Sequence, residues 1–323
     1  MKTIQATIDR NEPNPYVIGK AARIIRAGGL VAFPTETVYG LGADALNAEA
    51  VMKIYAAKGR PSDNPLILHV SGVPQAASLV EMNDTARKLA FKFWPGPLTL
   101  VLPAKPIIPP ITRGGLITAA VRMPNNTPAL ELIHASRTPL AAPSANISGR
   151  PSPTDAESVF HDMAGKIDMI LDAGTTGIGI ESTVIDVTNP LRVLLLRPGG
   201  LPREVIEDAI GMRLEAPDSD GARRSPGTRY RHYSPSIPVM IWRKGDKFPG
   251  DETCAYMGVD EPDGLCCGGK IMFTSYEDYA RGLFAGFRKF EADGFSRVIV
   301  QWPENDSGIC GGLRDRIKRS ASE

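Results

Sequence analysis

Short apolar runs alternate with helix-like segments along most of the chain. Residues 30–33 (Leu-Val-Ala-Phe) form a continuous apolar run typical of a buried strand. Before this run, Asn14 and Pro15 begin a segment with apolar residues at helical spacing, which ends at Gly28. The same spacing predicts further helices over residues 48–57, 83–93, 201–210, 275–293 and 313–320, and two that start near Thr127 and Thr154. Further strands are predicted over residues 2–8, 66–70, 99–102, 117–121, 140–142, 169–171, 183–187, 193–196, 239–242, 254–257, 270–273 and 297–301. Strands and helices that alternate in this way predict an α/β fold.

The segment from Pro34 to Asp44 combines hydroxyl groups, a carboxylate and two glycines directly after the first buried strand. Proteins of the α/β class bind ligands in such strand-to-helix loops. Gly40 and Gly42 are expected to allow backbone turns and the close approach of a ligand. The alternative is a turn whose hydroxyl groups only cap the next helix.

The length of 323 residues favours two domains. Between residues 215 and 238 the core-forming residues give way to Pro, Gly, Asp, Ser, Arg and Tyr. We therefore expect a first domain of mixed α/β character over residues 1–214, a linker over 215–238, and a small Rossmann-like α/β domain over 239–323. The linker is not a generic spacer, because residues 229–233 place cations and aromatic rings together.

Composition and charge indicate an ordinary globular protein, with 42% hydrophobic residues and a net charge of +1. The chain as a whole therefore has no strong attraction for nucleic acid or membranes. No segment approaches the roughly 18 apolar residues that span a bilayer, and the N-terminus lacks the pattern of a signal peptide. We expect a cytoplasmic protein without membrane contact. The four cysteines lack metal-binding spacing, which favours reduced structural thiols.

Polar side chains recur where the predicted strands of the first domain begin or end. They are Thr35, Thr37, His69, Arg122, Ser144, Asn146, Ser182 and Arg197, and Lys58 and Arg60 lie in a neighbouring loop. If the strands share a sheet, the cations meet in one cleft, which suits a polyanion such as a nucleoside triphosphate. Taken singly, each residue has a structural alternative: a surface ion pair, a structural histidine or a turn. No P-loop and no G-x-G-x-x-G motif occurs. The residues alone predict an anionic, phosphorylated ligand.

Several motifs resemble those of the YrdC-type threonylcarbamoyl-AMP synthases. They are Pro34-Thr-Glu-Thr-Val-Tyr-Gly-Leu41, Lys58-x-Arg60, Ser144-x-Asn146, Glu181-Ser-Thr-Val184 and Leu196-Arg-Pro-Gly199. Residues 225–235 (Ser-Pro-Gly-Thr-Arg-Tyr-Arg-His-Tyr-Ser-Pro) resemble the linker of the long, two-domain (Sua-type) form. The resemblance covers nearly the whole chain. It implies a YrdC-like twisted mixed sheet with helices, followed by a linker and the small C-terminal α/β domain.

The resemblance also implies an activity, that of a nucleotidyltransferase (L-threonylcarbamoyladenylate synthase). Such an enzyme makes threonylcarbamoyl-AMP and pyrophosphate from L-threonine, bicarbonate or CO₂, and ATP. The product supplies the group that a separate transferase complex places on adenosine 37 of tRNAs, and a direct tRNA contact is compatible with this. Mg²⁺ is expected with ATP, although the sequence identifies no protein ligands for it. The reaction needs positioning and charge neutralisation more than a protein nucleophile.

The resemblance implies two sets of site residues. Threonine is expected to contact Thr35, Thr37, His69, Arg122, the Ala142 backbone and Ser182. ATP is expected to contact Lys58, Arg60, Asn64, Thr118, Ser144, Asn146, Ser152, Arg197, Tyr230 and His232, with Lys58 and Arg60 as the catalytic pair nearest its phosphates. Two alternatives remain: a non-catalytic RNA-binding module, and a carbamoyltransferase of the hydrogenase-maturation type. Near-neutral charge argues against the first, and the lack of a Cys-rich array argues against the second.

Overall fold

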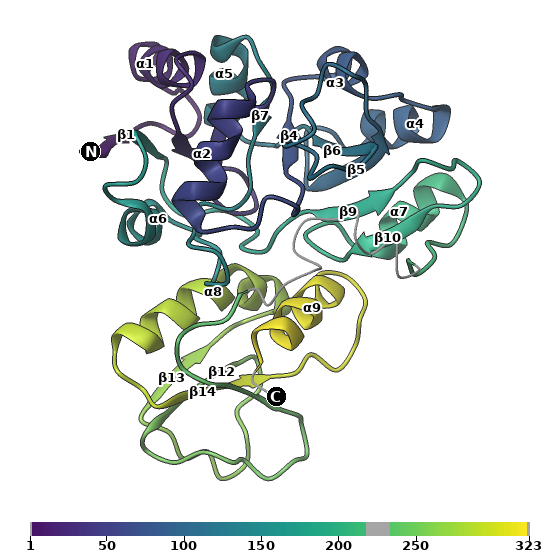
Figure 1. Ribbon diagram of the computed structural model, residues 1–323. Helices are drawn as coiled ribbons and strands as arrows, with labels where there is room; N and C mark the ends of the chain where they lie inside the picture. The colour runs from purple at the N-terminus through teal and green to yellow at the C-terminus, as the bar shows by residue number, and fades with distance from the viewer. Residues whose placement is uncertain (1, 218–232, 322–323) are drawn as a thin grey trace.

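The protein, described by a computed structural model, contains two sheets (Figure 1). The structure describes residues 2–217 and 233–321. The larger sheet has ten strands in the order β1-β8-β2-β3-β7-β4-β6-β5-β9-β10 and mixes parallel with antiparallel pairs. The smaller sheet has four parallel strands in the order β11-β14-β12-β13. Both findings confirm the predicted fold class.

The first domain contains ten strands and seven helices within the described residues. Its strands are β1 (Ile4–Thr7), β2 (Val31–Phe33), β3 (Gly40–Asp44), β4 (Ile67–His69), β5 (Leu98–Pro103), β6 (Thr118–Arg122), β7 (Leu140–Ala141), β8 (Met169–Asp172), β9 (Thr183–Asp186) and β10 (Leu194–Arg197). Its helices are α1 (Pro15–Arg26), α2 (Ala48–Lys58), α3 (Val73–Leu79), α4 (Asp84–Phe93), α5 (Thr127–Ser136), α6 (Ala156–Met163) and α7 (Arg203–Ile210).

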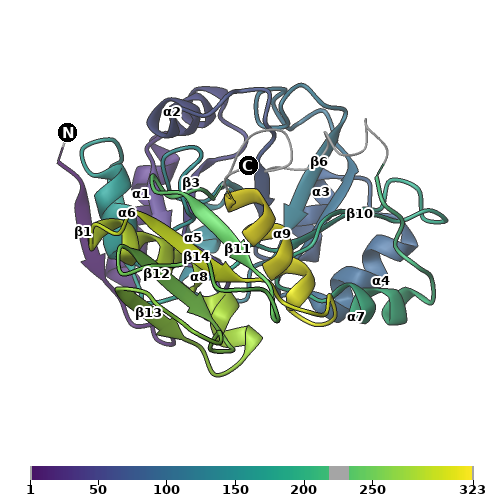
Figure 2. The same cartoon turned by 90° about the horizontal axis from the view of Figure 1, so that it is seen from below.

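The C-terminal domain is built around the four parallel strands β11 (Val239–Trp242), β12 (Cys254–Gly258), β13 (Gly269–Met272) and β14 (Arg297–Gln301). Its helices α8 (Tyr276–Ala292) and α9 (Cys310–Ser320) lie between this sheet and the first domain (Figures 1 and 2). The apolar side of α8 buries Tyr279, Leu283, Phe287 and Phe290. All four cysteines of the domain are free thiols.

Local signals in the sequence set most helix starts. The Asn14 side chain accepts a hydrogen bond from the backbone of α1, and Pro15 occupies its first turn, as predicted. One cap differs from expectation: Asp155, rather than Thr154, caps α6 by accepting from the Ser158 backbone. The helix therefore begins one residue later than the capping-box pattern indicates.

The segment after β2 differs from the predicted loop. Residues Gly40–Asp44 form the strand β3, which pairs antiparallel with β2. Gly42 does not make a turn, and a Cβ atom there would lie 2.7 Å from the Phe33 ring. The expected backbone turn at the two glycines is therefore wrong. Gly42 is small because an aromatic ring of the neighbouring strand packs against its backbone.

The chain after β10 still belongs to the core of the first domain. Ile206 and Ala209 of α7 and Leu214 are buried in the same apolar cluster as the first sheet. The first strand of the C-terminal sheet begins at Val239. In the described part of the chain, no helix is long and apolar enough to cross a membrane.

Candidate functional site

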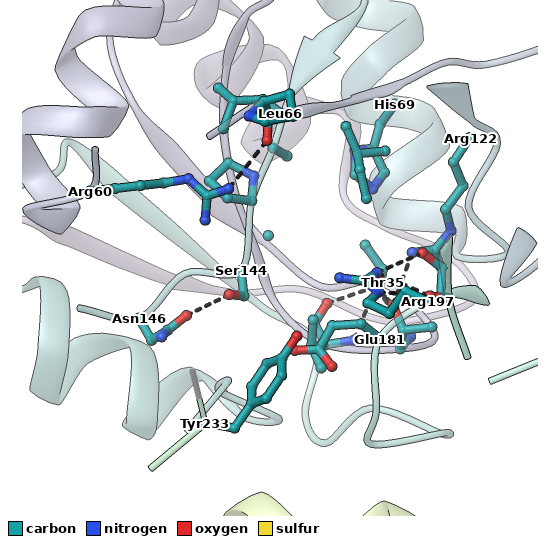
Figure 3. A pocket seen from close by; sticks show the side chains of 18 of the residues that line it. Thr35, Arg60, Leu66, His69, Arg122, Ser144, Asn146, Glu181, Arg197 and Tyr233 are labelled. Carbon is teal, nitrogen blue, oxygen red and sulfur yellow. Dashed lines mark hydrogen bonds between the residues drawn. The ribbon is translucent and has the colours of Figure 1, made fainter. Parts of the chain in front are cut away.

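A cavity of about 640 Å³, counted with its open mouth, lies where several strands of the first sheet end. The side chains that Figure 3 labels point toward it from several elements. Its lining includes Thr35, Thr37, Val38, Gly40, Arg60, Pro65, Leu66, Ile67, His69, Arg122, Ala142, Pro143, Ser144, Asn146, Arg150, Glu181, Ser182, Arg197 and Tyr233. The structure thus brings together all eight polar residues that the sequence placed at strand ends.

One side of the cavity, the strand-end wall, consists of Thr37, His69 and Arg122. His69 and Arg122 are register partners at the ends of the parallel strands β4 and β6. The Arg122 guanidinium donates from Nη1 to Thr37 Oγ1 (3.0 Å) and from Nε to the Gly96 carbonyl (3.2 Å). Thr35 Oγ1 lies 2.8 Å from Thr37 Oγ1. Sheet register and hydrogen bonds within the first domain therefore hold this wall.

Burial keeps His69 neutral. The ring is enclosed, and burial together with the positive charge of Arg122 lowers the pKa of His69 to about 3. Within the described residues, His69 Nδ1 is buried without a hydrogen-bond partner. Buried polar atoms are seldom left unpaired, so this nitrogen points to a ligand.

Glu36, for which the sequence suggested no role, lies beside the strand-end wall. Its Oε2 atom is 2.6 Å from Nη2 of Arg122, and both side chains are largely buried. Tyr39, the other unassigned residue of this segment, donates to the Gly174 carbonyl (2.7 Å) and is fully buried. We infer that Tyr39 is structural and that Glu36 balances the charge of Arg122.

The opposite side, the loop wall, consists of Ser144, Asn146 and Arg150. Ser144 Oγ donates to Asn146 Oδ1 (2.5 Å), and Asn146 Nδ2 donates to the Arg150 carbonyl (2.8 Å). Lys58 holds this loop from behind, because its ammonium donates to the carbonyls of Ser144 (2.6 Å) and Asn146 (2.5 Å). One antiparallel β-bridge, between Ser144 and Gly40, joins this wall to the sheet, and side-chain contacts hold the rest of it.

Lys58 and Arg60 have different positions, although the sequence predicts the same role for both. Arg60 lines the cavity, whereas Lys58 is not among the lining residues. Burial, followed by the charge of Arg60, lowers the pKa of Lys58 well below its usual value. Burial lowers the pKa of Arg60 to about 10, so this guanidinium remains charged at neutral pH. Asn64, next to Arg60 in the loop, has both amide atoms buried and unpaired in the described part of the chain.

A third side of the cavity is formed around β9 and β10. Arg197 Nη2 donates to the Ser182 carbonyl (3.0 Å), and Ser182 Oγ lies 2.8 Å from Thr99 Oγ1. Glu181 accepts from Ser152 Oγ at 2.5 Å, so Ser152 reaches the cavity wall only through this carboxylate. The positions of Ser182 and Arg197 follow from their places at the ends of adjacent antiparallel strands.

Some predicted site residues lie outside the cavity lining. Lys58, Asn64 and Ser152 are buried behind it, and Thr118 begins β6 at the end opposite to Arg122. Tyr230 and His232 lie outside the described residues. The sequence interpretation assigned no role to Arg150, Glu181 and Tyr233, which line the cavity. Glu181 and Tyr233 lie within the motifs Glu181–Val184 and 225–235, so their place in these motifs could have marked them as site residues.

Charge and hydrogen-bonding groups define what the cavity can bind. Its described lining contains four arginines and one glutamate, so positive charge prevails. Guanidinium groups bind carboxylates and phosphates through paired, charge-assisted hydrogen bonds. Among residues 2–217 and 233–321, no group of three or more His, Cys, Asp or Glu side chains is placed to hold a metal ion. The arrangement suits an anionic ligand with both carboxylate and phosphate groups.

Comparison with known proteins agrees with this picture. The Sua5/YciO/YrdC family model, described as "Telomere recombination", matches residues 23–199, and the model of the "Threonylcarbamoyl-AMP synthase, C-terminal domain" matches residues 201–322. The threonylcarbamoyl-AMP synthase of Pyrococcus abyssi is 55% identical over 97% of this chain and 96% of its own length. That of Bacillus subtilis is 42% identical over 97% and 95%.

A solved structure is similar over the whole length. The crystal structure of Pyrococcus abyssi Sua5 complexed with L-threonine has a TM-score of 0.89 and 41% identity, and it covers 99% of this chain and 98% of its own. The sequence similarity and the similarity of fold therefore extend over both domains. The chain belongs to the Sua5/YciO/YrdC family of threonylcarbamoyl-AMP synthases, in its two-domain form.

Proposed function

We propose that this protein makes threonylcarbamoyl-AMP and pyrophosphate from L-threonine, bicarbonate or CO₂, and ATP. The observation that carries this proposal is one cavity with two kinds of wall. The strand-end wall offers Arg122, a neutral His69 and threonine hydroxyls, which suit a hydroxylated amino acid. The loop wall and Arg60 offer groups that suit a triphosphate. The relative crystallised with L-threonine supports the first assignment.

Threonine would lie against the strand-end wall. Arg122 would bind its carboxylate, with Thr35, Thr37 and Ser182 supplying hydroxyl groups. The unpaired Nδ1 of His69 suits a hydrogen bond to the threonine hydroxyl. The backbone N–H of Ala142 donates to the Ile67 carbonyl (2.9 Å), so the Ala142 carbonyl is the atom that can accept from threonine.

ATP would lie between Arg60, the loop wall and Arg197, with Asn64, Thr118, Ser152, Tyr230 and His232 as further proposed contacts. The neutral threonine amine would attack the carbon of CO₂ and release a proton to solvent, or attack bicarbonate with loss of water, to form the carbamate. A carbamate oxygen would then attack the α-phosphorus while pyrophosphate leaves. The arginines would neutralise charge on the phosphates, and the two walls would align the carbamate with phosphorus. Lys58 contributes by holding the loop wall.

Mg²⁺ would enter as part of the ATP substrate. Glu181 in the cavity lining is paired with Arg316, and Glu36 beside the strand-end wall is paired with Arg122. Mg²⁺ is commonly held by substrate phosphates with few protein ligands, and this donor set fits that mode. The metal would neutralise phosphate charge there.

The product would serve tRNA modification. A threonylcarbamoyl group activated as an adenylate must be consumed by a transferase, and the family role assigns it to adenosine 37 of ANN-decoding tRNAs. A separate transferase complex would be the partner, and a direct tRNA contact is compatible with the proposal. Such a role favours the cytoplasm.

The test is pyrophosphate release with ATP, Mg²⁺, bicarbonate and L-threonine, together with mass spectrometry of the adenylate. We expect release that depends on threonine, and a reaction without threonine is the control. If ATP binds but threonine causes no release, the proposal is wrong. Tight tRNA binding without ATP or threonine binding would instead support an RNA-binding module, and preference for carbamoyl phosphate a carbamoyltransferase.

A further inference from the structure

One arginine of the C-terminal domain is buried directly behind the lining of the cavity. Arg316 of α9 is the largest fully buried side chain among the described residues, with 0% of its surface exposed. Lys318, two positions later on the same helix, is exposed. A guanidinium without solvent contact requires paired charges and hydrogen bonds, which makes its partners informative.

Most partners of Arg316 lie outside the C-terminal domain. Its Nε atom donates to Glu181 Oε2 at 2.6 Å, and its Nη1 atom donates to the Pro198 carbonyl at 3.1 Å. Its guanidinium lies 5.1 Å from the centre of the Tyr233 ring, and the neighbouring Asp315 also accepts a hydrogen bond from it. Two of these partners, Glu181 and Tyr233, line the cavity.

Two glycines allow α9 to come this close. A Cβ atom at Gly312, one turn before Arg316, would lie 2.8 Å from the Gly199 carbonyl oxygen. A Cβ atom at Gly199 would lie 2.3 Å from the Glu181 carbonyl oxygen. A larger residue at Gly312 would push α9 away from Gly199, and a larger residue at Gly199 would push that segment away from the Glu181 backbone. Close packing on both sides of Gly199 is therefore what delivers Arg316 to Glu181.

A negative charge on Glu181 would oppose the binding of a triphosphate in this cavity. Burial opposes its ionisation, but the charges of Arg316 and Arg197 and the hydrogen bond from Ser152 outweigh burial and lower its pKa. The carboxylate is therefore negative at neutral pH. Without a paired cation it would repel the phosphates and could turn away from Ser152 toward Arg197.

We propose that Arg316 is a positioning residue for the nucleotide: it neutralises Glu181 and holds it against Ser152, so that the arginines of the cavity serve the phosphates. This rests on the proposed function in that the ligand is ATP. The C-terminal domain thereby completes the nucleotide side of the site. The strand-end wall has no such contact with Arg316, so threonine binding is not under this control.

The test uses the full-length Arg316→Met variant, whose side chain fills similar space without charge. The dissociation constant for ATP with Mg²⁺ is measured by calorimetry, and KM for ATP and for L-threonine by pyrophosphate release. We expect the ATP constants to rise at least about tenfold, because like charges in a partly desolvated site oppose binding. The threonine KM should change much less. Arg319→Met, on the same helix and paired with Asp315, is the matched control and should behave as wild type.

Two further variants separate the effect of the Glu181 charge from the effect of losing the Arg316 side chain. Adding Glu181→Gln to Arg316→Met removes the unpaired carboxylate and should restore most of the ATP affinity. Glu181→Gln alone keeps the hydrogen bond to Ser152 and should bind ATP at least as well as wild type. This single variant decides the question even if Arg316→Met fails to fold, because a tenfold loss of ATP affinity in it would overturn the proposal.

Other results would also contradict the proposal. Unchanged ATP affinity in folded Arg316→Met shows that the pair does not position the nucleotide. If ATP and threonine affinities fall equally, the melting temperature drops and the double variant does not recover, Arg316 only stabilises the fold. If wild-type protein binds ATP but releases no threonine-dependent pyrophosphate, the proposed function fails, whereas the ATP measurements still test Arg316.

Discussion

The strand-end wall and the loop wall face the same cavity but are stabilised differently. The first is positioned by hydrogen-bonded strand pairs, with His69 and Arg122 in register. The second is a loop between a two-residue strand and a helix, and a single β-bridge from Ser144 to Gly40 joins it to the sheet. Lys58 holds the rest of it from behind, and the C-terminal domain holds it from outside. Arg288 of α8 donates to the Pro151 carbonyl at 2.6 Å, and Glu291 accepts from Arg150 at 2.6 Å.

Because of this difference, we expect the binding of threonine and the binding of ATP to respond differently to substitutions. Sheet register is insensitive to distant changes because many backbone hydrogen bonds share it, whereas a loop held by a few charged contacts responds to each of them. We therefore expect threonine binding to survive changes at the domain contact, and ATP binding to depend on them. Substitutions at either wall or at the domain contact test whether the two substrates bind independently.

The largest effect is expected for Arg60→Ala. The guanidinium lines the cavity and donates to the Pro65 carbonyl at 3.2 Å, so its loss removes charge from the phosphates. Turnover should fall by about 10²–10³-fold, as for loss of one preorganised donor, with little change in melting temperature. Pyrophosphate release and thermal unfolding measure the two quantities. Normal activity would remove Arg60 from the site.

Arg122→Lys tests the strand-end wall. A lysine cannot donate to both Thr37 and Gly96 while binding a carboxylate in paired fashion. The KM for threonine should rise by about 10–100-fold, the range for a lost hydrogen bond to a charged group, while the dissociation constant for ATP stays near wild type. Parallel losses for both substrates would show that the two walls are not independent.

Lys58→Met should affect stability as well as activity. The substitution leaves the buried carbonyls of Ser144 and Asn146 without their donor, at a cost of about 1–3 kcal/mol in unfolding free energy. Urea unfolding measures this loss, with Arg60→Ala as the comparison that retains stability. Activity lost at full stability would place the Lys58 ammonium in the reaction instead of behind the loop.

The neutral His69 predicts a pH dependence of stability. The folded protein keeps this ring neutral down to pH about 3, whereas an unfolded chain protonates it near its usual pKa of about 6.5. The unfolded state therefore binds one more proton between these values. The His69 contribution is complete above pH 6.5 and decreases as pH falls, by up to about 1.4 kcal/mol per pH unit.

Urea unfolding at pH 7, 6 and 5 checks this dependence. The difference in unfolding free energy between wild type and His69→Gln should shrink toward acid, because the variant lacks the titrating ring. A difference that stays constant from pH 7 to pH 5 would show that the ring protonates in the folded protein.

The smallest effect is expected for Arg281→Ala, which removes a contact between the domains away from the cavity. Arg281 donates to the Gly177 carbonyl at 2.9 Å and pairs with Asp278 on the surface. Stability should change by less than about 0.5 kcal/mol, as for exposed ion pairs. Calorimetry should find ATP affinity unchanged, and weaker ATP binding would mean that any domain contact, rather than the contact to Glu181, controls the nucleotide side.

Local patterns in the sequence predicted much of the fold. The apolar runs that became β4 and β6 end in His69 and Arg122 as expected, and Thr35 follows β2 after Pro34. These positions were predictable because a buried strand and the polar residue at its end are close in the chain. The strand β3 was not predicted, since its glycines carry no strand signal of their own. Their place in the sheet follows from pairing with β2 and from the Phe33 ring.

Strand ends, most helix caps and the kinds of groups that reach the cavity were predictable from the sequence, since they depend on neighbours in the chain. Tertiary packing places Lys58 behind the loop wall and turns Arg60 toward the cavity, and the loop sequence does not show this difference. Tertiary packing also decided that Arg316 reaches Glu181, 135 positions earlier. Helical spacing puts Arg316 on the same face as Leu313 and Ile317 and leaves Lys318 off it. That this face meets Glu181 follows only from the packing of α9 against Gly199 of the other domain.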